Sequence, residues 1–257
     1  MGDLVETRVT DDGFARITMT NASRRNALSS DAIDALRDAV EQVAATDARG
    51  LVLSGEGPVF SAGHDFGDLR ARDRDQVHDM LERCAQLMER LSSVPQVVLA
   101  RVQGPATAAG CQLVASCDLA VAVDDAWFAA PGGKGGWFCH TPMVAIGRQM
   151  ARKHAAEMAF TGDPIDAATA LQWGLLNRVV PAAELDATCD ELLDRATRGS
   201  RTSKAIGKST LYAQLDQDVA SAYRLTAEVM ADASATDDAQ ENMAAFVEKR
   251  RPVFQHR

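Results

Sequence analysis

The chain has 257 residues, of which 46% are hydrophobic and 25% charged, a composition typical of a soluble globular protein with one large core. Its 27 basic and 36 acidic residues give a formal net charge of −9, and this balance argues against the concentrated positive face that nucleic-acid binding requires. No apolar run approaches the ~18 residues of a membrane span, so neither nucleic acid nor a membrane is expected as a partner.

The cysteines and the N-terminus predict a cytoplasmic protein. The five cysteines are odd in number and form no C-x-x-C pair, which favours reduced thiols over a disulfide framework. The first residues, MGDLVETRVTDDG, show no basic-then-apolar signal pattern. The five are Cys84, Cys111, Cys117, Cys139 and Cys189.

Taken in chain order, the first predicted elements are a hairpin and a helix. Apolar residues over 4–9 and 14–19 flank Asp11-Asp12-Gly13, which is typical of two strands joined by a turn. Ser29 or Ser30 can cap a helix over 31–45, after a loop at 21–29. The apolar residues of that helix recur at helical spacing and are Ile33, Leu36, Val40 and Val43.

The following segments alternate between strand and helix. Strands are expected at 50–53, 96–102 and 118–123, with a helix at 75–91 between the first two. This rhythm predicts an α/β core rather than a β-sandwich. After Gly136 the chain becomes mostly helical, and a run of helices is expected from Pro181 to Arg250. We place a boundary near Gly199, between a core at 1–199 and a helical region at 200–257.

Two loops of small residues carry the main functional signal. Residues 55–67 include Ser61-Ala62-Gly63, and residues 104–113 open a helix with Thr107, Ala108, Ala109 and Gly110 expected in its first turn. Each could aim a backbone N–H into a shared pocket, and two such donors make an oxyanion hole. The structural alternative is a surface connection for the first loop and close strand–helix packing for the second, since packing also demands alanine and glycine.

Several other motifs favour structural roles. Gly132–Gly136 lacks the G-x-x-x-x-G-K-[ST] pattern of a phosphate loop. Gly207-Lys208-Ser209 comes nearer to it, but Thr202 stands where the first glycine should be, and the segment is expected between two helices rather than after a strand. The histidines show no metal-ligand spacing, so no metal is expected. His64 lies inside the first loop, and a lone histidine is more often hydrogen-bonded or solvated than catalytic. His140 beside Cys139 could suggest a thiolate pair, but the side chains of adjacent residues rarely meet.

At these residues the chain resembles the crotonase superfamily, the enoyl-CoA hydratase/isomerase family. Several separate motifs match in order over nearly the whole chain. They are Asn26-Ala27-Leu28-Ser29, PVFSAGHDFGDL at 58–69, QGPATAAGCQLVASCDLAVA at 103–122, FTGDPIDAATALQWGLLNRVVP at 160–181 and AAFVEKRRPVF at 244–254.

The resemblance implies a fold, an assembly and a ligand. The fold would be a spiral of β-β-α units followed by helices that build a homotrimer or a hexamer formed from two trimers. The ligand would be an acyl-CoA thioester, with coenzyme A as part of the substrate and no covalently bound cofactor. The thioester oxygen would lie between the backbone N–H groups of His64 and Ala109. The residues implied to contact CoA, the last two from a neighbouring subunit in many members, are Arg24, Arg25, Ala27, Leu28, Ala62, Asp65, Phe66, Phe246 and Lys249.

The chain departs from the family's hydratases at two positions. By motif position the two glutamates that handle water and the α-carbon proton correspond here to Gln112 and Gly132. Glutamine cannot accept or deliver a proton at neutral pH, and glycine has no side chain. We therefore expect weak or absent hydratase turnover.

Two further hypotheses stay open at this stage. The SAGHD segment also resembles methylmalonyl-CoA decarboxylase, whose reaction needs carbanion stabilisation rather than a base, although Phe138 falls where that enzyme has a tyrosine. Alternatively, the chain is a non-catalytic acyl-CoA-binding protein that kept the pocket and lost the chemistry.

Overall fold

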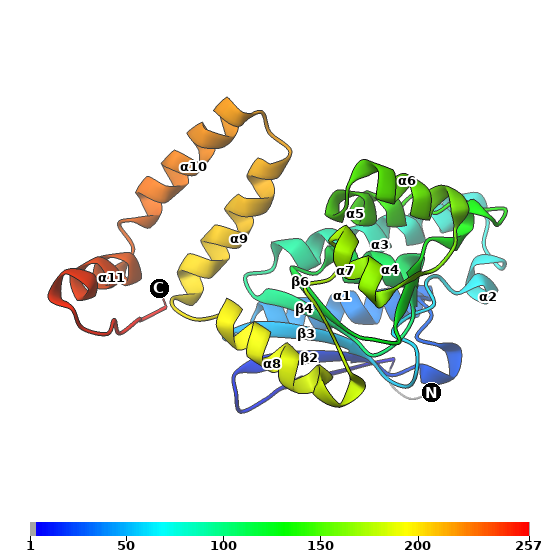
Figure 1. Ribbon diagram of the computed structural model, residues 1–257, viewed down its shortest axis with the longest axis horizontal. Helices are drawn as coiled ribbons and strands as arrows, with labels where there is room; N and C mark the ends of the chain where they lie inside the picture. The colour runs from blue at the N-terminus through cyan, green and yellow to red at the C-terminus, as the bar shows by residue number, and fades with distance from the viewer. Residues whose placement is uncertain (1–3, 257) are drawn as a thin grey trace.

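A six-stranded sheet forms the centre of the computed structural model, which describes residues 4–256 (Figure 1). The strand order is β1-β2-β3-β4-β6-β9; β1 and β2 pair antiparallel, and every other neighbouring pair is parallel. The six strands are Val5–Val9, Phe14–Met19, Gly50–Gly55, Val97–Val102, Leu119–Val123 and Arg178–Val180. The central strands β3, β4 and β6 carry buried runs rather than alternating patterns, as expected where a sheet is covered on both faces.

A second, three-stranded sheet has the order β5-β7-β8, from Ala106–Thr107, Trp127–Ala129 and Ile165–Asp166. Single-residue bridges extend its line: Leu28 pairs with His64, and Ser61 pairs with Ala106. Successive turns of the chain therefore place one strand in the large sheet and one short segment beside the small sheet. This arrangement is a spiral, and its small-sheet edge carries both small-residue loops.

Helices cover the large sheet on its two sides (Figure 1). Helix α8 packs on β4 and β6, while α1 packs on β1, β2 and α3. The helices are α1 (Ser30–Ala44), α2 (Phe66–Leu69), α3 (Arg74–Ser93), α4 (Ala109–Ser116), α5 (Pro142–Gln149), α6 (Arg152–Thr161), α7 (Ala167–Trp173), α8 (Leu185–Ala196), α9 (Arg201–Leu215), α10 (Val219–Ala233) and α11 (Asp237–Glu248), with short 3-10 turns at Ala22–Arg24, Pro131–Gly133 and Ala182–Glu184. Within residues 4–256, none combines the length and apolar character needed to cross a bilayer.

Side-chain caps mark where helices α1 and α3 begin. The Ser29 side chain accepts the N–H of Ala32 at the start of α1. Asp73 and Gln76 form a reciprocal capping box at the start of α3. The predicted apolar stripe of α1 is fully buried, and α1 and α3 correspond to the first two predicted helices, which are confirmed. The antiparallel pairing of β1 with β2 confirms the predicted hairpin.

Helices α9–α11 form an arm that projects from the rest of the chain (Figure 1). The arm is attached through α9, which packs on α3 and β4, whereas α10 contacts mainly α9 and has no buried residue. Gly207-Lys208-Ser209 lies inside α9, not between two helices as expected, so it is not a phosphate loop. Its Lys208 instead reaches into the core.

Candidate functional site

The two small-residue loops lie against each other, as the sequence predicted. Thr107 donates its N–H to the Ser61 carbonyl (3.0 Å) and its Oγ1 hydroxyl to the Ala62 carbonyl (3.0 Å). Gly63 has a φ of +81°, and a Cβ there would lie 2.8 Å from the Thr107 oxygen and 3.1 Å from the Ala109 nitrogen. Glycine is thus required at position 63 both for its backbone and for this close approach.

The bridge between Leu28 and His64 turns the N–H of His64 away from its neighbouring strand. Leu28 donates to the Gly63 carbonyl (2.8 Å) and accepts from Asp65 (3.1 Å), so it pairs with the residues on both sides of His64. In such a parallel bridge the backbone groups of the central residue point to the opposite side. The His64 N–H is therefore directed toward the second loop's side of the site.

Helix α4 supplies the second N–H. It begins at Ala109, so Thr107 lies in β5 and the sequence-based start was two residues early. Ala108, which precedes the helix, has φ +49° and ψ −118°, and its N–H donates to the Ala129 carbonyl (2.9 Å). The first N–H groups of a helix have no acceptor inside the helix and carry its partial positive charge. The Ala109 N–H consequently has no acceptor within its own helix, and it lies beside Gly63.

A small apolar cavity of about 70 Å³ opens next to these donors. Two of its aromatic rings pack together, with ring centres of Phe66 and Trp137 6.2 Å apart, and a third, Phe138, packs on Phe160 outside the wall (5.9 Å). Sequence reasoning did not assign the walls from Leu81, Trp137, Thr141 and Pro142. The lining residues are His64, Phe66, Leu81, Ala108, Trp137, Phe138, Cys139, His140, Thr141 and Pro142, with no aspartate or glutamate among them.

The side chain of His64 is partly buried, and its two ring nitrogens are shielded from solvent. Both ring nitrogens, Nδ1 and Nε2, lie out of solvent and lack a partner among residues 4–256. Burial lowers the pKa of His64 from its ordinary value of 6.5, and the nearby Leu28 backbone opposes this shift. The imidazole is therefore neutral at pH 7.

Neither of the positions that match the family glutamates lines the cavity. Gln112 lies in α4, is 3% exposed, and its Oε1 has no partner within the described residues. A Cβ on Gly132 would lie 2.2 Å from the Trp137 oxygen and 2.7 Å from the Cys139 nitrogen. The segment carrying Trp137 and Cys139 thus occupies the space that a side chain at 132 would need.

The residues implied to contact CoA fall into two groups in space. Arg24 forms an ion pair with Asp65 (2.8 Å), which caps α2 near the cavity, and Phe66 is exposed there. Arg25 and Ala27 lie in the same loop as Arg24, and the side chain of Leu28 is buried in the core, so only its backbone is available. Ala62 donates its N–H to the Arg25 carbonyl (3.0 Å) and so belongs to this first group. The structure does not bring Phe246 and Lys249 to the cavity.

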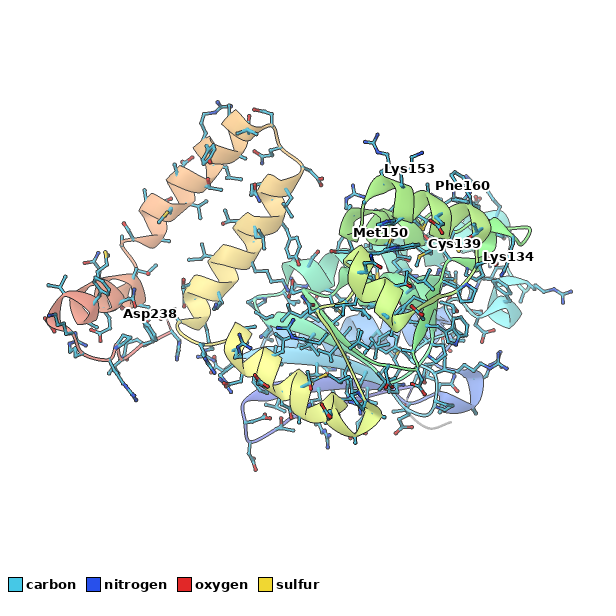
Figure 2. All side chains as sticks on the ribbon, in the orientation of Figure 1. Lys134, Cys139, Met150, Lys153, Phe160 and Asp238 are labelled. Atoms are coloured by element: carbon cyan, nitrogen blue, oxygen red, sulfur yellow. The ribbon has the colours of Figure 1, made fainter. Side chains whose placement is uncertain are left out.

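Phe246 and Lys249 lie at the end of α11, in the arm. Figure 2 shows Cys139 and Phe160, which mark the cavity side, at the opposite end of the molecule from Asp238 of α11. Phe246 is 83% exposed and Lys249 is also exposed. Within one chain these two residues do not contribute to the cavity.

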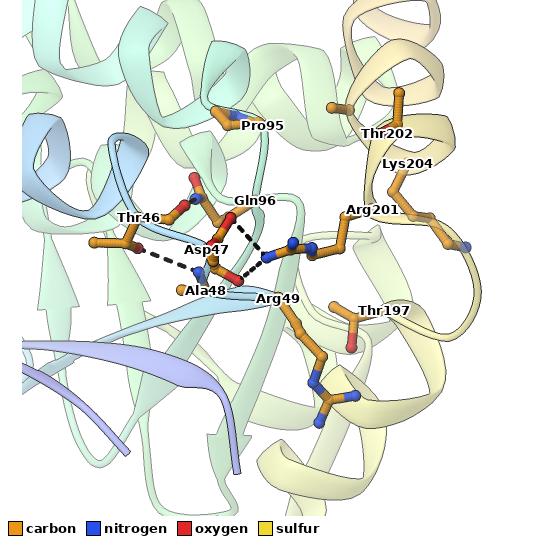
Figure 3. A pocket seen from close by; sticks show the side chains of 11 residues that line it. Thr46, Asp47, Ala48, Arg49, Pro95, Gln96, Thr197, Arg201, Thr202 and Lys204 are labelled. Carbon is orange, nitrogen blue, oxygen red and sulfur yellow. Dashed lines mark hydrogen bonds and ion pairs between the residues drawn. The ribbon is translucent and has the colours of Figure 1, made fainter. Parts of the chain in front are cut away.

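A second pocket, of about 180 Å³, is less suited to chemistry (Figure 3). It lies where α9 meets the end of α1 and the start of β4. Arg201 pairs with Asp47 (3.0 Å), and Gln96 donates to the carbonyls of Val43 (3.1 Å) and Thr46 (3.3 Å). These groups bond mainly to one another, so the pocket is a seam between the core and the arm.

The model of the enoyl-CoA hydratase/isomerase family matches residues 10–257, nearly the whole chain. This chain belongs to that family, and so to the crotonase superfamily. Mouse enoyl-CoA hydratase domain-containing protein 3, mitochondrial, is 45% identical over 247 residues, covering 95% of this chain and 82% of the relative.

Solved structures confirm the expected spiral α/β fold. An enoyl-CoA hydratase from Mycobacterium smegmatis matches with a TM-score of 0.95 and 39% identity, covering 98% of this chain and 99% of that one. Human enoyl-CoA hydratase domain-containing protein 3 matches with a TM-score of 0.93 and 43% identity, covering 98% and 100%.

The expectation of a cytoplasmic protein is wrong by the same comparisons. The mouse, rat and human relatives, 44–45% identical, are all named as mitochondrial proteins. Destination is encoded by short targeting segments rather than by the composition of a folded core, so charge and cysteine content were a poor guide. Within residues 4–256 no cluster of three or more histidine, cysteine or acidic side chains is arranged to hold a metal.

Proposed function

We propose that this family member binds acyl-CoA thioesters and stabilises a thioester enolate between the backbone N–H groups of His64 and Ala109. The observation that supports the proposal is the close approach of Gly63 to the Thr107–Ala109 segment, beside a cavity lined by His64 and Ala108. Preorganised donors of this kind each contribute about 10²–10³ in rate when charge develops on an oxygen. The cavity's apolar wall suits the acyl chain.

We further propose that hydratase turnover is weak. Water addition needs groups that move protons, each contributing about 10²–10⁴ in rate. The cavity wall holds no carboxylate, Gln112 lies outside it, and the space at Gly132 is filled by backbone. Polarisation of the thioester by the two N–H groups would remain.

Hydration of crotonyl-CoA, followed by loss of the conjugated thioester absorbance, tests this proposal. We expect acyl-CoA binding by calorimetry together with a hydration rate several orders of magnitude below the ordinary enzyme range of about 1–10³ s⁻¹. A turnover number inside that range would contradict the proposed loss of hydratase chemistry, and no binding of any acyl-CoA would contradict the ligand itself.

A decarboxylase is the second candidate. Loss of CO₂ from a malonyl-type thioester leaves an enolate directly, so an oxyanion hole suffices and no carboxylate base is required. The carboxylate-free wall around His64 is the observation that favours it. Product from a malonyl-type thioester would establish this activity; binding without product from malonyl-type, 2-enoyl or 3-enoyl thioesters would instead favour a non-catalytic acyl-CoA-binding protein.

We propose that the arm at 200–257 builds a homotrimer, or a hexamer of two trimers, and that its boundary with the core lies near Gly199. Exposed apolar residues on the arm support this assembly, and a neighbouring copy would bring Phe246 and Lys249 to the cavity of the next chain. The exposed apolar residues of the arm include Leu211, Leu215, Val219, Tyr223, Met230, Met243, Phe246 and Val247.

Light scattering after gel filtration measures the assembly, and a monomer would contradict it. Lys249→Ala should weaken CoA binding by removing a positive charge from the phosphate-bearing ligand, whereas Lys204→Ala, an exposed lysine on α9, should leave the affinity unchanged. Equal affinities for the two variants would show that Lys249 does not contact CoA.

A further inference from the structure

The imidazole of His64 is an unusual group for the wall of an apolar cavity. A lone histidine in a folded protein is normally hydrogen-bonded or solvated, and here the ring nitrogens are neither. A buried polar group without a hydrogen bond is destabilising, and a ligand that supplies the missing partner would offset that loss. The cavity beside it is the place from which a ligand can supply that partner.

The other titratable groups of the wall are poorer proton acceptors or lie farther out. Burial raises the pKa of the Cys139 thiol, which therefore stays protonated near neutral pH. His140 is exposed, with its ring packed 5.1 Å from that of Phe138. His64 is the member of the set whose nitrogens are withdrawn from water.

The carboxylates closest to His64 in the chain are already engaged. Asp65 pairs with Arg24 (2.8 Å) and caps α2. Asp68 accepts the N–H of Ser30 (2.8 Å) and pairs with Arg72 (2.8 Å). Neither lines the cavity, so neither is placed to act on a group bound there.

We propose that the side chain of His64 is the proton-transfer group of this site and accepts a proton from the α-carbon of the bound thioester. The inference rests on the proposed thioester binding. One residue would then supply both an N–H to the carbonyl oxygen and a base to the adjacent carbon. Covalent geometry favours this pairing, because the ring is tethered to the same backbone as the donor N–H.

The step balances without a further reactant. A lone pair of the neutral imidazole takes the proton, the Cα–H bond breaks, and its electron pair forms the C=C bond of the enolate. The negative charge moves to the thioester oxygen, between the N–H groups of His64 and Ala109. The imidazolium then returns its proton to the α-carbon, or to the γ-carbon of a 3-enoyl chain whose double bond has shifted.

Deuterium exchange at the α-carbon of butanoyl-CoA in D₂O, read by mass spectrometry, tests the assignment. His64→Gln keeps the backbone N–H but removes the base, so exchange should fall by about 10²–10⁴ while the affinity for butanoyl-CoA stays within a few-fold. His78→Gln is the control, because His78 is exposed on α3 beside Glu82, outside the cavity. It should exchange at the wild-type rate.

Two results would overturn the assignment. Exchange could persist in His64→Gln, in which case its loss in His140→Gln would point to that residue instead, or it could be absent in the wild type despite normal binding. In both, measurable binding leaves the proposed thioester ligand intact. Absence of binding would instead reject both proposals.

Wild-type exchange as a function of pH gives an answer even when the glutamine variant does not fold. Neutral His64 is the active form, and burial holds its pKa below 6.5, so the rate should be constant near pH 7 and fall only at pH below 6.5. Cys139, His140, Asp65 and Asp68 are the other groups near it that titrate. A rate that stays constant from pH 8 down to the pH at which the protein unfolds would reject the role.

Discussion

Two polar groups of opposite character lie near the two ends of helix α4, its N-terminal front and its C-terminal rear. At the front, beside the Ala109 N–H, the His64 ring has no hydrogen-bond partner in the described residues. At the rear, just after the last residues of the helix, Asp118 accepts from the Val98 N–H, the Lys208 ammonium and the Tyr212 hydroxyl, each at 2.7 Å. Lys208 donates two further bonds to core carbonyls.

From this contrast we infer that the rear cluster is structural, and we propose that the front group binds a ligand. A buried ion pair is retained only when its remaining hydrogen-bonding capacity is met, and the rear cluster meets it with groups from α9, β4 and the end of α3. The cluster anchors the arm to the core. At the front, the capacity is left open next to a cavity, as expected of a group whose partner is a ligand.

The largest effect is expected from breaking the rear cluster. Lys208→Met should leave Asp118 buried without its cation and lower the free energy of unfolding by about 3–5 kcal/mol. Denaturant unfolding at fixed protomer concentration measures it, because assembly contributes to stability. Lys204→Met, exposed on the same helix, should change stability by less than about 0.5 kcal/mol. An equal loss of unfolding free energy in Lys208→Met and Lys204→Met would contradict the structural role of Lys208.

The second-largest effect concerns the contact between the two loops at the front. Gly63→Ala would place a Cβ 2.8 Å from the Thr107 oxygen in a backbone with φ +81°, so the two donors must separate. We expect α-carbon exchange on bound thioester to fall by about 10²–10³, the contribution of one oxyanion donor. Unchanged exchange in a folded Gly63→Ala protein would show that the close approach does not set the site.

Gly132→Ala should have a smaller effect, on the cavity wall. The added methyl would meet the Trp137 oxygen at 2.2 Å, so the segment that carries Trp137 and Phe138 must shift, at a cost of about 1–3 kcal/mol in unfolding free energy. Gly136→Ala is the matched control, since a Cβ there has nothing within 4 Å. Thermal unfolding of the pair compares them; a stability loss in Gly136→Ala as large as in Gly132→Ala would contradict the steric explanation.

The smallest effect is a pH dependence of stability at the front. Burial places the folded-state pKa of His64 below its unfolded value of 6.5, so its contribution to stability is full above 6.5 and is lost as pH falls through the folded-state pKa. His64→Gln should therefore lose less stability on acidification than the wild type does. Parallel curves for His64→Gln and the wild type would show that this ring does not resist protonation.

Much of the core was predictable because its signals are local. The stripe of Ile33, Leu36, Val40 and Val43 fixes α1, and the hairpin around Gly13 follows from alternation and turn residues. The strands of the small sheet were missed, since segments of two or three residues such as Ala106–Thr107 carry no periodic pattern. They form because the spiral brings successive turns together.

The site was only partly predictable for the same reason. Both small-residue loops were found from composition, but the wall of the cavity joins Leu81, Trp137 and Pro142 from distant segments, with no local signal linking them. The unpartnered state of the His64 ring depends on every neighbour around it. The closed space at Gly132 depends on how residues 137–139 fold back, which glycine content alone does not reveal.

The left-handed backbone of Ala108 bears on how this protein can diverge. An alanine at φ +49° and ψ −118° costs about 1–3 kcal/mol of backbone strain, which a glycine would largely avoid. Ala108→Gly would therefore remove this strain and make the turn before α4 more flexible. The strained Ala108 backbone lowers stability but fixes the direction of the neighbouring Ala109 N–H. That direction is set when the chain folds, before the proposed thioester ligand binds. Selection for thermal stability alone would therefore favour glycine at position 108, at the expense of the fixed direction of the Ala109 N–H.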